Sequence, residues 1–179
     1  MSSKDAKKQG AFIQWNHPPY KQKTKDQWEA PQQRLLEEGL LDGIEIVGHT
    51  NLFTKAMQWA DQYQLTITSS SDIHYLIDTK HEFYHRPITL IFAKENTVES
   101  IKEALFQKRS IAYYKDQLIG DKKFTEAIFT TSIKAEYFDC STEKKSKTFA
   151  LNNTSDIPFK LTLIQATRQY NYPKEILSS

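Results

Sequence analysis

Residues 43–69 read GIEIVGHTNLFTKAMQWADQYQLTITS. The stretch opens with GIEIV (43–47) and closes with LTITS (65–69), two runs whose β-branched and apolar residues predict buried strands. Between them, residues 52–63 predict a helix, because apolar residues recur at helical spacing: Phe53, Ala56, Met57 and Ala60. A strand, a helix and a second strand in this order are typical of a βα unit in a largely parallel sheet.

The same alternation extends over the first two thirds of the chain. Further strands are predicted at 11–15, 88–93 and 110–114, and further helices at 27–39 and 97–108, the last with its N-cap at Thr97 or Asn96. Beyond about residue 125, apolar and polar residues alternate between turn-rich segments, which predicts a small antiparallel β unit. We therefore expect two domains: an α/β domain over 1–124 and a β-sandwich-like appendage over 125–179.

Composition excludes several classes of function. The 179 residues contain 24 basic and 22 acidic side chains spread along the chain, so no field strong enough for nucleic acid or an anionic membrane is expected. No apolar run approaches the roughly 20 residues that span a bilayer, and the first ten residues lack the apolar core of a signal peptide. The single cysteine, Cys140, excludes an internal disulfide and a cysteine-based zinc site, and its expected role is packing. We expect a soluble protein, whose localisation the sequence leaves open.

Asp72 and His74 follow the predicted strand 65–69. In an extended chain, side chains two residues apart project to the same face, so a carboxylate and an imidazole would be directed at one point. The pattern indicates half of a metal site. The alternative is a turn in which Asp72 bonds backbone N–H groups and His74 lies on the surface.

A second histidine ends another predicted strand. In FIQWNHPPY, His17 follows an apolar run and precedes Pro18. The carboxyl edge of a parallel α/β sheet is where active sites are built, so two strands would deliver ligand-type residues to the same edge. A structural histidine before a proline turn is the alternative interpretation for His17.

Five blocks occur in an order and spacing that resemble the second half of a PHP (polymerase and histidinol phosphatase) domain, close to the Sb-PDE group of PHP phosphodiesterases. The likeness covers roughly residues 4–125, and the β unit that follows is also similar to the small C-terminal domain of those proteins. The blocks are GAFIQWNHPPY, LLDGIEIV, SSSDIHY, HRPITLIFAKENTVESIKEALFQKRSIAYY and DQLIG.

The resemblance implies the C-terminal part of a distorted (β/α)7 barrel, followed by a small antiparallel β domain. Barrels of this family bind up to three zinc, manganese or iron ions with histidines and acidic residues at strand ends. His17 matches the histidine of the late His-Pro block, and Asp72 and His74 match the closing Asp-x-His. The resemblance thus implies that all three are metal ligands.

Three further residues would bind substrate or support the ligands. Glu45 matches an acidic strand position and would orient a ligand or a loop. Arg86 lies where a basic side chain could meet a phosphate, although a structural ion pair is an equal alternative. Asn16 precedes the ligand His17 and belongs to the same group.

The sequence also departs from the family pattern. It contains no His-x-His, no TDH block and no counterpart of the middle ligands, and HPPY stands where HPGW is expected. The opening residues, SKDAKKQG, read as the final turns of a helix. We therefore expect a C-terminal portion with an incomplete site that holds at most one ion and is inactive alone. His49, His81 and His85 match no ligand position and are interpreted as surface or loop histidines.

The expected function of the complete protein is metal-dependent hydrolysis of a phosphoester, as a phosphodiesterase or a phosphatase. The alternative is a noncatalytic module that binds a partner through the β unit or the half-barrel. Self-association through the exposed edge of FIQWN is expected in either case.

Overall fold

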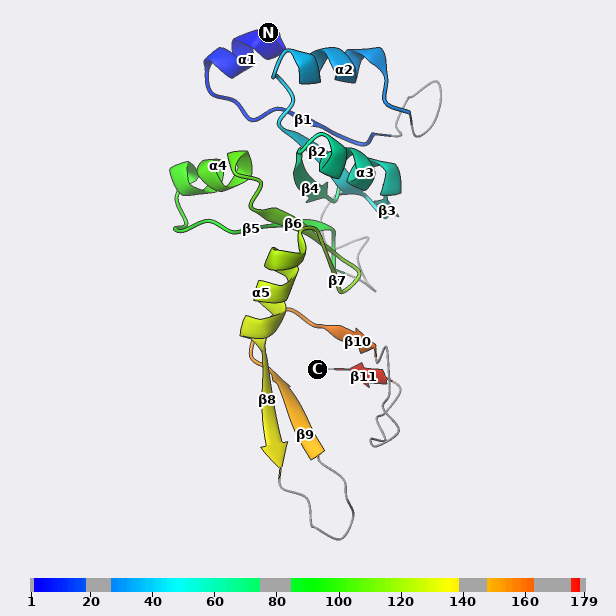
Figure 1. Ribbon diagram of the computed structural model, residues 1–179, viewed down its shortest axis with the longest axis vertical. Helices are drawn as coiled ribbons and strands as arrows, with labels where there is room; N and C mark the ends of the chain where they lie inside the picture. Colours follow the sequence, from blue (N-terminus) through cyan, green and yellow to red (C-terminus); the bar gives the residue numbers. More distant parts are fainter. Residues whose placement is uncertain (1, 19–26, 75–84, 139–147, 163–174, 178–179) are drawn as a thin grey trace. The chain divides into compact units, whose positions relative to one another are not determined.

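The computed structural model describes residues 2–18, 27–74, 85–138, 148–162 and 175–177 (Figure 1). The chain forms two compact units, Met1–Phe124 and Thr125–Ser179.

The first unit alternates strands and helices along the chain. Its elements are α1 (Ser3–Lys8), β1 (Gln14–Trp15), α2 (Ala30–Glu37), β2 (Gly43–Gly48), β3 (Asn51–Leu52), α3 (Thr54–Gln62), β4 (Thr66–Ser70), β5 (Ile88–Ile91), α4 (Val98–Phe106), β6 (Ser110–Tyr114) and β7 (Gln117–Ile119). The helix α5 (Lys122–Ser132) continues from the first unit into the second.

A short parallel sheet forms around β2. Both β1 and β4 pair with β2 in parallel, and β3 adds an antiparallel pair at its end. The α3 connection between β2 and β4 is the βα unit that the sequence predicts, and the α/β class is confirmed. Parallel strands need such a crossover because the chain must return to its starting edge.

The strands β5 and β6 differ from the predicted parallel arrangement. They pair antiparallel, with Ile88 opposite Tyr113 and Ile91 opposite Ser110, and β7 continues the antiparallel sheet. The backbone N–H of Phe92 donates to the carbonyl of Arg109, so the connection through α4 leaves and re-enters the sheet at the same end. Among the described residues the strands form four separate sheets, and none closes into a barrel.

The core of the first unit lies between β2 and α3. Ile44, Ile46 and Val47 are fully buried, and they pack with Ala56 and Ala60 of α3. The apolar stripe of the predicted helix therefore faces the sheet. Burying such aliphatic side chains stabilises by roughly 1.5–3 kcal/mol each. Three tryptophans extend this core, with the rings of Trp15 and Trp59 stacked at 5.4 Å and Trp28 edge-on to both.

Two helix ends bear on the sequence interpretation. Thr97 is the N-cap of α4, and its hydroxyl accepts from the Ser100 N–H at 3.2 Å, as predicted. The opening residues contain the end of a helix, because α1 ends at Lys8 with Gln9 as its C-cap and Gly10 in a left-handed conformation (φ 73°). The Ser2 hydroxyl and the Asp5 carboxylate form a capping box at the other end of α1.

The second unit contains two antiparallel pairs. The strands β8 (Ile133–Phe138) and β9 (Thr148–Asn153) pair along their whole length, and β10 (Lys160–Thr162) pairs with β11 (Glu175–Leu177). Phe159 is buried and meets the ring of Phe129, on α5, edge-on at 5.8 Å. The residue pattern does not predict the helical start of this unit. It assigns the residues after about 125 to a β unit, whereas α5 continues as a helix to Ser132. A sandwich arrangement of the pairs stays a prediction.

The described helices include none with the length and apolar character that crossing a bilayer requires. Cys140 and His81 lie outside the described residues.

Candidate metal centre

The ends of three strands bring the predicted site residues to one edge of the parallel sheet. We call this edge the rim; its residues are Asn16 and His17 after β1, His49 and Thr50 after β2, and Ser71 to His74 after β4. The three strands share a direction, so residues that follow them meet at the same edge.

Glu45, on β2, is the buried anchor of this rim. Its side chain has no exposed surface. One carboxylate oxygen, Oε2, accepts from the His17 backbone N–H at 2.7 Å and lies 2.7 Å from His17 Nδ1. The other, Oε1, accepts from the Ser70 hydroxyl. A buried carboxylate is tolerated when hydrogen bonds replace its water, and here these bonds also fix the His17 ring.

The orientation of His17 brings it toward the pair from β4. With Nδ1 held by Glu45, the other ring nitrogen, Nε2, lies 3.8 Å from Asp72 Oδ1. The same Asp72 oxygen lies 3.3 Å from His74 Nε2. The structure therefore brings His17, Asp72 and His74 together, although the His74 side chain is 77% exposed.

These separations can be compared with those in a metal site. Two ligands of one tetrahedral ion, each at about 2.0–2.1 Å, stand roughly 3.3–3.5 Å apart. The pair Asp72–His74 matches that spacing, and the pair Asp72–His17 exceeds it by a few tenths of an ångström. Within the described part of the chain, no group of three or more His, Cys, Asp or Glu side chains has the arrangement of a formed metal site.

Two of these residues adopt a left-handed backbone. The φ angles of His17 and Asp72 are 44° and 47°. This region is costly for residues other than glycine, and such conformations concentrate at functional sites, where the surrounding structure holds them. For His17 the holding contact is the Glu45 carboxylate on its backbone N–H.

Thr68 adds a polar group beside Glu45. It pairs in register with Glu45 across β2 and β4, so the two side chains share a face of the sheet. Its Oγ1 is buried and has no hydrogen-bond partner among the described residues. Sequence reasoning missed Thr68, because a threonine in a strand carries no signal of its own.

Asn16 belongs to the rim and Arg86 lies near it, but neither joins the group formed by His17, Asp72 and His74. The Asn16 side-chain oxygen accepts from Gln14 Nε2 at 2.6 Å. Arg86 is exposed just before β5 and forms no ion pair within the described residues, so the structural pairing considered above is absent there. The Thr89 hydroxyl bonds to both the N–H and the carbonyl of Ser69, at the end of β4. This contact places the start of β5, and Arg86 with it, at the rim.

His85 lies in the loop before β5, within the interpretation as a surface or loop histidine, and its ring makes specific contacts. Its side chain is 25% exposed and stacks on the Tyr113 ring at 4.0 Å. The Asp116 N–H donates to Nε2 at 3.1 Å, so Nδ1 carries the proton and donates to the Arg86 carbonyl at 2.9 Å. The Tyr113 hydroxyl donates to the Asp116 carboxylate at 3.3 Å. His49, in contrast, is exposed, as interpreted.

The environment of Tyr113 changes its acidity. Burial, together with the negative charge of Asp116, raises the pKa of Tyr113 to about 12. Tyr113 therefore remains a neutral hydrogen-bond donor at physiological pH.

Comparison with known proteins shows a likeness to a solved structure. No model of a known protein family matches the chain, and no curated protein matches it. A crystal structure from Bacteroides vulgatus, of a two-domain protein containing a predicted PHP-like metal-dependent phosphoesterase, is 31% identical with a TM-score of 0.86. The likeness covers 98% of this chain and 52% of the other, so the chain spans about half the length of that protein.

Proposed function

We propose that this chain contributes part of the active site of a PHP-family, metal-dependent phosphoesterase, close to the Sb-PDE phosphodiesterases and built on a (β/α)7 barrel. One observation carries the proposal: the Asp72 carboxylate lies between the imidazoles of His17 and His74. The likeness to a PHP-like metal-dependent phosphoesterase, at 31% identity, supports it independently.

The residues at the rim fit a divalent ion such as zinc, manganese or iron. Imidazole and carboxylate suit these metals, and the spacing of Asp72 to each histidine is close to that of ligands sharing one ion. The carboxylate of Glu45 on His17 Nδ1 is the outer partner that metal-binding histidines usually have. His17, Asp72 and His74 would hold the ion, and three ligands suffice for one ion only.

The chemistry divides between the ion and the chain. A bound divalent ion would lower the pKa of a coordinated water and stabilise negative charge on a phosphoester. Glu45 keeps the ring of His17 oriented toward Asp72. Arg86, which has no ion pair within the described residues, would bind phosphate oxygens through its planar fork of N–H groups. Asn16 and the buried Thr68 hydroxyl would bind the substrate or an ordered water.

Metal titration tests the proposal. We expect zinc or manganese to bind the purified chain in isothermal titration calorimetry. His74→Ala and Asp72→Asn should each weaken binding by about tenfold or more, because the first removes a ligand and the second removes the negative charge of a ligand. Asparagine is chosen for Asp72 since it tolerates the left-handed backbone at this position.

His49 provides the matched control. It lies on the same rim and also has a left-handed backbone with φ 57°, and within the described residues its ring bonds to the hydroxyl of its neighbour Thr50 alone. His49→Asn should leave metal affinity unchanged. The absence of binding by the wild-type chain, or equal affinity in all variants, would favour the noncatalytic partner-binding module instead.

A further inference from the structure

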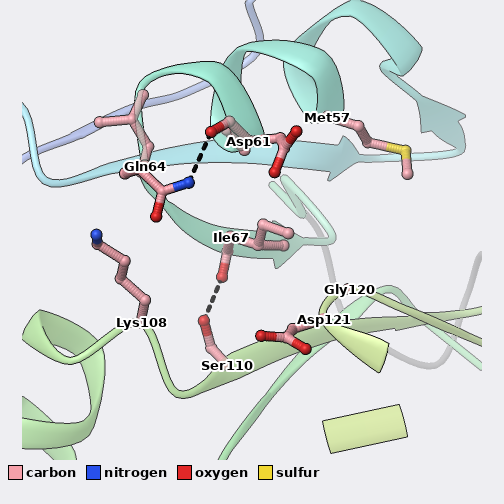
Figure 2. A pocket seen from close by; sticks show the side chains of 10 residues that line it. Met57, Asp61, Gln64, Ile67, Lys108, Ser110, Gly120 and Asp121 are labelled. Atoms are coloured by element: carbon pink, nitrogen blue, oxygen red, sulfur yellow. Dashed lines mark hydrogen bonds between the residues drawn. The ribbon is translucent and has the colours of Figure 1, made fainter. Parts of the chain in front are cut away.

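A second cavity lies at the opposite end of β4 from the rim (Figure 2). Its volume is about 430 Å³, within the range of small-molecule sites. Leu65 and Ile67, at the start of β4, line it, whereas Asp72 follows the end of that strand. The cavity is therefore separate from the proposed metal centre. A ligand bound there would have a role beyond the proposed function.

The lining combines an apolar floor with polar side chains. Met57, Ala60, Leu65 and Ile67 supply the apolar surface. In Figure 2, Ile67 lies between the side chains of Asp61 and Gln64, at and just after the end of α3, and those of Lys108, Ser110 and Asp121. An apolar surface with a few convergent polar groups is the usual composition of a ligand site.

Two opposite charges in this lining are exposed and form no ion pair within the described residues. The carboxylate of Asp61 and the ammonium of Lys108 form no ion pair with each other or with any other described residue. Asp121 differs, because its carboxylate accepts from the Lys123 N–H at 2.9 Å and lies 3.3 Å from the Lys123 ammonium. Asp61 and Lys108 are thus the two charges available to a ligand.

The ends of two helices hold these charges in place. At the end of α3 the Leu65 N–H donates to the Ala60 carbonyl, and at the end of α4 the Arg109 N–H donates to the Ala104 carbonyl, each at 2.9 Å. These bonds, with left-handed backbones at Gln64 (φ 55°) and Lys108 (φ 58°), form two Schellman motifs. The C-terminal ends of helices carry partial negative charge, which favours a cationic group beside Asp61.

We propose that this cavity binds a small zwitterion with an aliphatic body, of the class of the branched-chain amino acids. The ammonium of the ligand would pair with Asp61 and its carboxylate with Lys108. The aliphatic body would cover Met57 and Ile67. We propose a zwitterion rather than a simple acid or amine because Asp61 and Lys108 carry opposite charges, lie apart in the lining and form no ion pair within the described residues.

Methionine methyl NMR on the full 179-residue chain tests the inference. The chain has two methionines, so a methyl-labelled sample gives one signal from the cavity, Met57, and one reference from Met1. We expect L-leucine to shift the Met57 signal saturably and to leave Met1 unchanged. Isocaproate, which lacks the ammonium, and isoamylamine, which lacks the carboxylate, should each bind about tenfold or more weakly, since each loses one charged contact.

Variants assign each charge to its partner. Asp61→Asn should abolish the preference for leucine over isocaproate, and Lys108→Gln should abolish the preference for leucine over isoamylamine. Lys55→Gln, at an exposed lysine in the first turn of α3, is the matched control and should change neither preference. All measurements are made with a chelator present, so the result is independent of metal binding at the rim. No shift of Met57 with leucine, or preferences unchanged in both cavity variants, would overturn the proposal.

Discussion

Glu45 shows how one buried charge can organise a strand end. Its carboxylate accepts from His17 and Ser70, which reach it from β1 and β4. We predict that Glu45→Gln lowers the free energy of unfolding by about 1.5–3 kcal/mol, because the amide cannot replace charge-assisted bonds to both oxygens. Urea denaturation would measure this change. Glu95→Gln, at an exposed loop position, should stay within about 0.5 kcal/mol of the wild type.

Tyr113 gives a prediction about pH. Its pKa is raised to about 12, first by burial and then by the charge of Asp116. The folded chain thus keeps this proton where an unfolded tyrosine, with a pKa near 10, has lost it. Tyr113 therefore contributes stability that is fully present below about pH 10 and is lost as the pH rises toward 12.

A substitution separates the two causes of this shift. Asp116→Asn removes the charge and keeps the burial, so the pKa of Tyr113 should fall but remain above its ordinary value. NMR titration of labelled tyrosine ring carbons would follow the signal directly. An unchanged pKa in Asp116→Asn would show that the carboxylate does not act on Tyr113.

The helices α3 and α4 both end in a Schellman motif without the usual glycine. Gln64 occupies the left-handed position after α3 with φ 55°. We predict that Gln64→Gly stabilises the chain by about 0.5–1 kcal/mol, since glycine adopts this conformation without a steric cost. Gln62→Gly, only two residues earlier but within α3, should destabilise by a similar amount. Thermal unfolding that showed the same sign for both variants would contradict this assignment.

The unit around β5 and β6 illustrates the limit of reasoning from local patterns. The residue pattern predicts strand, helix and strand, and all three form, as β5, α4 and β6. The same pattern suits parallel and antiparallel pairs. The direction is decided by contacts that close the connection at one end, such as the bond from Phe92 to Arg109.

The described residues offer three candidate ligands for metal, and this number limits the activity that we expect. We predict that it binds no more than one divalent ion in a titration monitored by atomic absorption. We also predict negligible hydrolysis of a chromogenic phosphodiester with added manganese, because a single, exposed ion lacks the further ions that PHP barrels use to position a nucleophilic water. His74 is 77% exposed, which leaves this ion open to solvent. Robust turnover, abolished by Asp72→Asn, would show that one ion suffices.

The sequence by itself determined the local helices and strands. It also determined which strand ends are followed by polar residues. Periodicity and β-branched content located β2, β4, β6, α3 and α4, since these preferences act over a few neighbouring residues. The sequence also showed that His17, Asp72 and His74 follow apolar runs that were predicted as strands. The alternation of two along a strand predicted that Asp72 and His74 project to one side, but Asp72 lies beyond the end of β4 with a left-handed backbone (φ 47°), so the turn after the strand sets their positions.

Only the tertiary structure decided which distant residues meet. Glu45 reaches the His17 backbone across 28 positions, and Asp116 reaches His85 across 31. The cavity likewise depends on α3 and α4 ending beside the starts of β4 and β6. No local preference encodes such contacts, because their free energy comes from burial and hydrogen bonds that exist only after the strands and helices have packed.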